Sequence, residues 1–253
     1  MPSFATVRLL ARNDVRLIAR DKMLVTMAVF IVVMGVATRY ALPAIDTALA
    51  NGGVMPSDTV TLRFSDTFPM FVAFIALWQA ANIPGVLFGF ILLGEKEDQT
   101  LQALRVTPLP LRVYTGYRVG VSAAVALLAA LYLSYSIGWS SLPPLRLLPI
   151  ALGASLTAPL AVLFYATFAS NKIQGLALTK FGGVAGLLIL VGFFVPEPWQ
   201  WLLGVFPPLL VAKSYWMALD GRAWYWLPLL IGSVAQVGLL VLLINRFRRA
   251  VSR

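Results

Sequence analysis

The chain contains neither cysteine nor histidine. Their absence excludes disulfide bonds, thiolate catalysis, imidazole acid–base catalysis and zinc sites built from Cys and His. Charged residues are also scarce, since they make up 12% of the 253 residues, about half the share found in an ordinary soluble domain. Hydrophobic residues make up 60%. This composition excludes a soluble protein and predicts one that lies in a membrane.

Six apolar runs are each long enough to cross a bilayer as a helix, which takes about 20 residues. They occupy residues 23–42, 67–93, 113–137, 147–170, 176–195 and 224–245. The sequence therefore predicts an all-α integral membrane protein with six transmembrane helices. No internal repeat and no polar stretch of domain size is visible between them, so we expect residues 1–253 to form a single domain.

Lysine and arginine are unevenly distributed between the segments that flank these runs. With the N-terminus inside, the inner segments hold 15 of these residues and the outer segments 5, whereas the acidic residues divide evenly. Anionic lipid and the membrane potential hold cations on the cytoplasmic side, so we expect both termini in the cytoplasm. A signal peptide cleaved near Ala48–Ala50 is the competing interpretation of the start. The apolar run before it has about 20 residues, longer than the roughly 7–15 of such a signal.

Residues 4–22 predict a basic amphipathic helix before the first span. One sector of it holds Arg8, Arg12, Arg16 and Arg20, and the opposite sector holds Phe4, Val7, Leu10, Ala11, Val15 and Ile18. We expect this helix to lie in the inner headgroup layer with its arginines on lipid phosphates. A solvated basic arm is the alternative.

The segment between the second and third spans, residues 94–112, is charged and is expected at the cytoplasmic membrane surface. It begins Gly-Glu-Lys-Glu-Asp-Gln-Thr-Leu-Gln-Ala-Leu-Arg-Val-Thr-Pro-Leu. Thr100 can cap a short helix whose apolar side is Leu101 and Leu104, and Pro108 ends it. Such a helix suits a groove on another protein, and a plain loop of solvated charges is the alternative.

This run resembles the cytoplasmic signature of the ABC-2 type exporter permeases, which have the type V exporter fold. In that family an acidic run, Thr-Leu, a hydrophobic spacer and Thr/Ser-Pro-Leu follow the second span. The likeness covers the whole chain, from an amphipathic elbow helix to a long outer segment between spans five and six. The Glu-Lys-x-x-x-Thr pattern is most similar to the drug-export permeases, including the fluoroquinolone group. One departure is Gln99, where the family usually has Gly, which enters left-handed conformations more readily.

The resemblance implies an ABC-2 type transmembrane domain in the inner membrane of a prokaryote. Such a domain pairs with a second copy or a homologous permease and seats its loop on a separate cytoplasmic ABC ATPase. The residues that it assigns to ATPase coupling are Glu95, Glu97, Asp98, Thr100, Leu101, Leu104 and Thr107. The chain has no Gly-x-x-x-x-Gly-Lys-Ser/Thr run, so we expect no cofactor on it, with ATP and Mg bound by the partner.

The outer segment, residues 196–222, contains two apolar pieces of fewer than about 12 residues, too short to span. We expect two short helices that dip back into the outer leaflet, separated by Pro207 and Pro208. In the resembled family this region closes the outer end of the pathway, which makes Phe206, Pro207 and Pro208 the outer gate. An interfacial aromatic belt without gating is the alternative.

The second span carries Trp78, Gln79 and Asn82 near its middle, with Pro84 expected to kink the helix there. Buried amides are costly in hydrocarbon unless they are paired. These residues therefore either line a translocation pathway at the dimer centre or hold helices together. In the fifth span, the Gly182–Gly186 pattern of Gly-x-x-x-Gly suggests close helix contact, within the chain or between two copies.

An exporter permease for an amphiphilic or hydrophobic substrate, such as a drug or a lipid, is the leading functional hypothesis. The spans carry no charged residue near mid-depth, where ion routes need one. A gradient-driven secondary carrier is the alternative, although it predicts intramembrane carboxylates and often a repeat. An intramembrane enzyme would have only hydroxyls such as Tyr132, Tyr135 and Tyr165 to work with. We expect no catalytic residue, no metal site and no nucleic-acid partner.

Overall fold

The computed structural model describes residues 4–51, 63–99, 111–139 and 142–252. Within these ranges the chain forms helices and no strands. The α-helices are α1 (Phe4–Arg20), α2 (Lys22–Asn51), α3 (Phe68–Val72), α4 (Ala80–Glu97), α6 (Leu111–Ile137), α7 (Pro144–Ser155), α8 (Thr157–Phe168), α9 (Lys172–Phe194), α10 (Pro207–Leu219) and α11 (Trp226–Ser252). Three short 3-10 segments are η1 (Phe64–Thr67), η4 (Trp199–Val205) and η5 (Ala223–Tyr225), and η2 (Ala73–Gln79) is π-helical.

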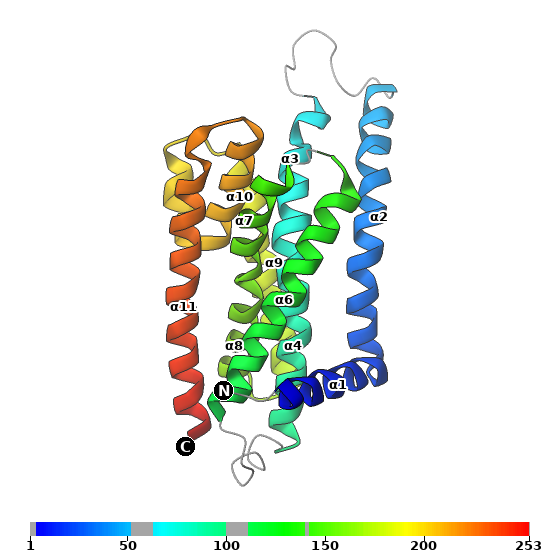
Figure 1. Ribbon diagram of the computed structural model, residues 1–253. Coiled ribbons are helices and arrows are strands. Elements are labelled where there is room, and N and C mark those ends of the chain that lie inside the picture. Colours follow the sequence, from blue (N-terminus) through cyan, green and yellow to red (C-terminus); the bar gives the residue numbers. More distant parts are fainter. Residues whose placement is uncertain (1–3, 52–62, 100–110, 140–141, 253) are drawn as a thin grey trace.

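Six helical stretches are long and apolar enough to cross a membrane, which confirms the expected number of spans. They are Lys22–Asn51, Phe64–Glu97, Val113–Ile137, Pro144–Phe168, Lys172–Phe194 and Ala223–Phe247. They run side by side, with α1 and the last turns of α4 and α11 at one end, here called the α1 end (Figure 1). The short helix α10 lies towards the other end, here called the α10 end (Figure 1). The chain is therefore a multi-pass membrane protein.

Among the described helices, α4 and α8 share the most extensive contact, and glycines on α4 let the two backbones approach. A Cβ added at Gly85 would lie 2.7 Å from the Cβ of Ala161, and one at Gly89 would lie 2.9 Å from the Tyr165 ring. Small residues at such contacts are typical of membrane helices, where van der Waals packing holds helices together. The pair α4 and α8 forms the centre around which the other helices lie.

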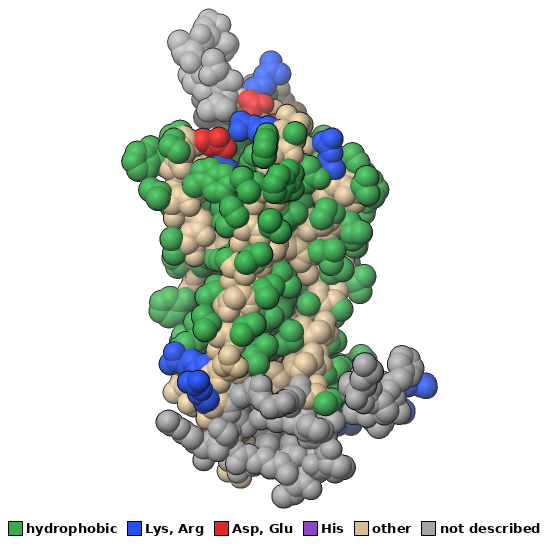
Figure 2. All heavy atoms as spheres, turned by 60° about the vertical axis from the view of Figure 1, so that its left-hand side comes forward, with side chains coloured by type: hydrophobic (Ala, Val, Ile, Leu, Met, Phe, Trp, Pro, Cys, Tyr) green, Lys and Arg blue, Asp and Glu red, His purple; other side chains and the backbone are tan. Residues whose placement is uncertain are grey.

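The outer faces of α2, α9 and α11 are apolar and exposed, as a helix facing lipid requires. Figure 2 shows apolar side chains over the middle of the face in view, with Lys and Arg towards both ends and Asp and Glu towards the upper end. This distribution matches a hydrocarbon layer between two aqueous or headgroup layers.

The chain turns sharply between α1 and α2 at Asp21. Its carboxylate accepts hydrogen bonds from the backbone N–H of Met23 at 2.9 Å and of Leu24 at 3.4 Å, so it caps the start of α2. As a result α1 lies across the end of α2 rather than continuing it (Figure 1). A helix thus covers residues 4–20 of the segment, 4–22, in which one is expected.

The second span contains a π-helical turn that includes two of the residues that the sequence singled out. The backbone N–H of Ala80 bonds to the carbonyl of Ile75, five residues back, at the end of η2. Pro84 follows within α4 and has no N–H to bond to the carbonyl of Ala80. A π-turn of this kind often marks a functional position in a helix, and here it ends on Trp78 and Gln79.

Candidate functional site

A buried arginine organises the α1 end. Arg118 of α6 has 1% of its side chain exposed and pairs with Asp14 of α1 at 2.7 Å and with Glu95 of α4. Its Nε donates to the hydroxyl of Tyr114 at 2.8 Å, and that hydroxyl donates to Glu95. The Tyr117 hydroxyl donates to Asp14 at 2.7 Å. This Arg118 cluster (Asp14, Glu95, Tyr114, Tyr117 and Arg118) supplies the pairing that a buried charge needs, and it joins three helices.

Three consecutive residues at the end of α4 contact three different helices. Glu95 reaches Arg118 on α6, as described above. The ammonium of Lys96 donates to the carbonyl of Ala169, just after α8, at 2.8 Å. A carboxylate oxygen of Glu97 accepts the backbone N–H of Lys172, where α9 begins, at 2.7 Å.

Neighbouring side chains on a helix point about 100° apart, so three in a row can face three directions. Two of these contacts also suit the ends of helices, because a cation stabilises terminal carbonyls and a carboxylate stabilises a helix N-terminus. Glu95, Lys96 and Glu97, here called the α4 hub, therefore tie the end of α4 to α6, α8 and α9 at once.

The hub leads directly into the segment that resembles the coupling loop. Asp98 and Gln99 are exposed, and Gln99 has a φ of 55°, in the left-handed region. Gln99 thus has a backbone conformation that Gly adopts freely and that costs Gln about 1–2 kcal/mol of conformational free energy. The other residues assigned to ATPase coupling, Thr100, Leu101, Leu104 and Thr107, lie outside the described residues.

A cavity of about 420 Å³, here called the central pocket, lies among η2, α4, α8, α9 and α11 and beneath the start of α10. Its lining is largely apolar and includes Trp78 and Asn82 from the expected pathway. It also includes Phe206, Pro207 and Pro208, the expected outer gate. The structure therefore brings together two groups of residues that are far apart in the sequence.

The third expected pathway residue, Gln79, is half-buried and is not among the residues that line the central pocket. Its amide oxygen accepts a long hydrogen bond of 3.5 Å from the Asn82 amide. Gln79 therefore contacts a residue of the pocket lining without lining the pocket itself.

The indole of Trp78 forms part of the wall between the pocket and α9. Its ring centroid lies 5.1 Å from that of Phe206, in an edge-to-face arrangement. Its N–H is buried and has no partner among the described residues. A Cβ at Gly186 would lie only 2.3 Å from this nitrogen, and one at Gly182 would lie 3.3 Å from the Asn82 amide oxygen. The Gly-x-x-x-Gly face therefore packs against η2 and α4 of the same chain.

The outer segment contains a second buried cation, which the sequence analysis did not single out. Lys213 of α10 has 1% of its side chain exposed. Its ammonium donates to Glu197 and to Gln200, both at 2.8 Å, and lies 4.8 Å from the centre of the Trp201 ring. The hydrogen bond from Lys213 is the main cause that lowers the pKa of Glu197 below its ordinary value. These contacts join η4 to α10, two helices of 7 and 13 residues that are both too short to span.

The sequence positions of the buried charged residues give a weak indication that they are buried. Asp14 is four residues from both Leu10 and Ile18, so it lies in the apolar sector of α1 rather than among the arginines. Arg118 stands inside the third apolar run, four residues after Tyr114. Lys213 likewise stands inside an apolar stretch. A charged residue on an apolar face predicts a buried partner, but it does not identify that partner.

The comparisons with known proteins agree on one family. A family model described as fluoroquinolones export permease protein Rv2686c-like matches residues 14–244. Two curated proteins from Mycobacterium tuberculosis are similar to the chain, each 32% identical over 243 residues. They are fluoroquinolones export permease protein Rv2686c of strain H37Rv and fluoroquinolones export permease protein MT2760 of strain CDC 1551. The alignment covers 94% of this chain and 92% of each relative. No solved structure matches the chain.

Proposed function

Because this chain belongs to the family of Rv2686c-like fluoroquinolone export permeases, we propose that it is the membrane-spanning subunit of an ATP-driven drug exporter. Two copies, or one copy and a homologous permease, form the transport pathway. A separate cytoplasmic ABC ATPase binds ATP and Mg and drives the pathway open. The substrate is amphiphilic or hydrophobic, and fluoroquinolones are the class that the names of the relatives suggest.

The observation that carries this proposal is the α4 hub. The loop that the ATPase contacts, residues 94–112, begins at the hub, and the hub contacts α6, α8 and α9 directly. A displacement of this loop by the ATPase therefore moves three helices together rather than one. Two of them, α8 and α9, line the central pocket. Motion at the α1 end then changes the shape of the pocket in the middle of the bundle.

The central pocket is the section of the pathway that holds the substrate. Its apolar wall accommodates an aromatic body, and the amide of Asn82 supplies a polar contact. Phe206, Pro207 and Pro208 cover it on the side of α10, in keeping with an outer gate. In this proposal η4 and α10 are the two outer helices that dip back into the outer leaflet.

The α1 end faces the cytoplasm of a prokaryotic cell. The bias of lysine and arginine towards the inner segments supports this orientation. The helix α1 acts as an elbow in the inner headgroup layer, and the exposed side chains of Arg8, Arg12, Arg16 and Arg20 support contact with lipid phosphates. The Arg118 cluster fixes this elbow to the end of α4.

Purification at native expression level tests the proposal. We would tag the chain, solubilise the membrane in mild detergent and identify stoichiometric companions by mass spectrometry. An ABC ATPase in equal amount, with fluoroquinolone efflux that stops on ATP depletion, is the expected result. Efflux that stops with a protonophore and continues without ATP, from a chain that purifies alone, would instead indicate a gradient-driven secondary carrier.

A further inference from the structure

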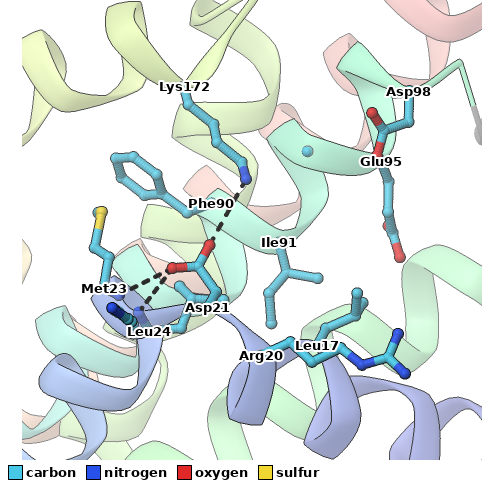
Figure 3. Close-up of a pocket in the computed structure, with 12 residues that line it drawn as sticks. Leu17, Arg20, Asp21, Met23, Leu24, Phe90, Ile91, Glu95, Asp98 and Lys172 are labelled. Carbon is cyan, nitrogen blue, oxygen red and sulfur yellow. Dashed lines mark hydrogen bonds and ion pairs between the residues drawn. The ribbon is translucent and has the colours of Figure 1, made fainter.

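A second cavity lies at the α1 end, and the proposed transport pathway does not use it. It has a volume of about 550 Å³ and lies between the end of α1, the start of α2, the end of α4 and the start of α9. Ligand pockets for drug-sized molecules have volumes of about 300–1,000 Å³. We call this cavity the α1 pocket and show it in Figure 3.

The α1 pocket exists because the chain turns at Asp21 and because α4 carries a glycine at the wall. The turn separates α1 from α2, and the gap between them is not filled by a side chain from α4. A Cβ at Gly94 would lie 3.1 Å from the Cε of Lys172, so the missing side chain leaves room for the stem of that lysine. The lysine extends along the wall towards Asp21 (Figure 3).

The charges in the α1 pocket have both signs and stand on different sides of it. Lys172 and Asp21 form a pair at 3.8 Å, with 46% and 36% of their side chains exposed. Figure 3 shows Asp98 and Glu95 across the cavity from this pair, and the side chain of Arg20 runs along the lower edge with its guanidinium towards the side of Glu95. Glu95 is committed to Arg118, whereas Asp98 has no hydrogen-bond or ion-pair partner in the described part of the chain.

The pair between Lys172 and Asp21 is weak enough for a ligand to replace. It is longer than a direct hydrogen bond and is open to water, and exposed pairs of this kind contribute little to stability. An anionic group bound to Lys172 would keep the lysine paired. A cationic group bound beside Asp98 would pair a carboxylate that otherwise has only water.

Only a ligand with both charges satisfies the two sides. A simple anion would meet the carboxylates of Asp98 and Glu95, and a simple cation would meet Lys172, so each leaves an unpaired charge at a partly buried site. Between the charged sides the cavity has an apolar floor of Leu24, Phe90 and Ile91. This floor suits the apolar part of an amphiphile.

We propose that the α1 pocket binds the headgroup region of a zwitterionic amphiphile. The anionic group pairs with Lys172, the cationic group pairs with Asp98, and the adjoining apolar part lies on Phe90 and Ile91. Two sources have this chemistry, a zwitterionic phospholipid of the surrounding leaflet and a zwitterionic drug taken up from the α1 side. The site is separate from the central pocket and does not depend on export.

Native mass spectrometry of the purified chain in detergent tests the charge requirement, with no ATPase or nucleotide present. Three lipids with the same tails are added in turn: zwitterionic dilauroylphosphatidylethanolamine, anionic dilauroylphosphatidylglycerol and uncharged dilauroylglycerol. We expect the zwitterion to be retained about tenfold more strongly than either of the others. Equal retention of the three lipids would overturn the proposal.

A pair of matched variants on α9 locates the binding. Lys172→Gln removes the exposed ammonium in the pocket, and Lys180→Gln removes an exposed ammonium on the same helix that does not line it. Neither change removes a buried contact, so both variants should fold. We expect about tenfold weaker retention of the zwitterion by Lys172→Gln and no change in Lys180→Gln. Retention by Lys172→Gln that equals the wild type would also overturn the proposal.

Competition distinguishes the two sources of the ligand. Displacement of the zwitterionic lipid by ciprofloxacin, a zwitterionic fluoroquinolone, supports the pocket as a drug site. Retention of the lipid in excess ciprofloxacin supports it as a site for a phospholipid. Both outcomes are consistent with the proposed binding of a zwitterion. A chain that retains neither the lipid nor ciprofloxacin would contradict it. Since no transport step is measured, a failure of the proposed export function leaves this result unchanged.

Discussion

The two ends of the bundle each bury a cation, but they pair it in different ways. At the α1 end, Arg118 bonds to Asp14, 104 positions away in the sequence, and to Glu95 on a third helix. At the α10 end, Lys213 bonds to Glu197, only 16 positions away, and that carboxylate is 47% exposed. The first arrangement joins distant helices, as the proposed function requires for motion to pass between them. The second joins two neighbouring short helices, η4 and α10, within one local segment.

Removal of the cation at the α1 end should have the largest effect. Arg118→Met leaves Asp14 buried and Glu95 partly buried with no cation to pair them, so we expect a loss of about 3–5 kcal/mol in the free energy of unfolding. Thermal unfolding in detergent, followed by size exclusion, measures it. The triple variant Arg118→Met, Asp14→Asn, Glu95→Gln removes the charges together and should recover part of the loss. Equal stability of the single variant and the wild type would show that the cluster holds nothing together.

Disruption of the α4 hub should stop transport more than it affects folding. Glu97→Arg places a cation at the N-terminus of α9, which costs about 0.3–1 kcal/mol, and it breaks the contact with the backbone N–H of Lys172. We expect a loss of at least about tenfold in ATP-driven fluoroquinolone efflux. Asp220→Arg, at an exposed carboxylate of the α10 end, is the matched control. Normal ATPase stimulation and efflux in Glu97→Arg would remove the coupling role.

The cation at the α10 end should matter less to stability than Arg118. Lys213→Met keeps the apolar stem of the side chain, and Glu197 remains in contact with water. We expect a loss of about 1–2 kcal/mol in the free energy of unfolding, together with a changed efflux rate as η4 loosens from α10. A loss as large as that of Arg118→Met would show that the two buried cations contribute equally to stability.

A substitution at Gln99 should have a small effect on stability, and this effect should be stabilising. Gln99→Gly relieves a left-handed residue in the turn after the hub, so we expect the free energy of unfolding to rise by up to about 1 kcal/mol. Gln99→Ala keeps the strain and should not stabilise the protein. A fall in stability in the glycine variant would mean that the Gln99 side chain has a role of its own.

The pH dependence of Glu197 should be the smallest effect. Its pKa is lowered from an ordinary 4.5, chiefly by the hydrogen bond from Lys213. Its contribution is therefore complete above pH 4.5 and is lost as the pH falls towards the lowered pKa. The difference in unfolding temperature between the wild type and Glu197→Gln should shrink below pH 4.5 and stay constant above it. A difference that persists in acid would assign the effect to packing instead of charge.

The spans, the helix α1 and two short helices within residues 196–222 were predictable, because each depends on the length or the periodicity of a local apolar pattern. The placement of the two short helices in the outer leaflet stays a prediction. Of the three residues expected to line a pathway, Trp78 and Asn82 line the central pocket and Gln79 does not, and their role in a pathway stays a prediction. Glu95 was expected as a coupling residue, but its burial against Arg118 was not foreseen. The face of a helix that a polar residue occupies follows from the sequence, whereas the neighbour that it meets there does not.

The sequence by itself determined the membrane setting, the number of spans, the asymmetry of positive charge and the signature shared with a permease family. Each of these properties depends on residues that are neighbours in the chain, so it can be predicted without knowledge of the fold. Only the tertiary structure decided which charges are buried, which helices the end of α4 joins, and that Trp78 meets Phe206 across one cavity. Such properties depend on which helix faces pack together, and this is set by close contacts such as those at Gly85 and Gly186, between segments distant in the chain.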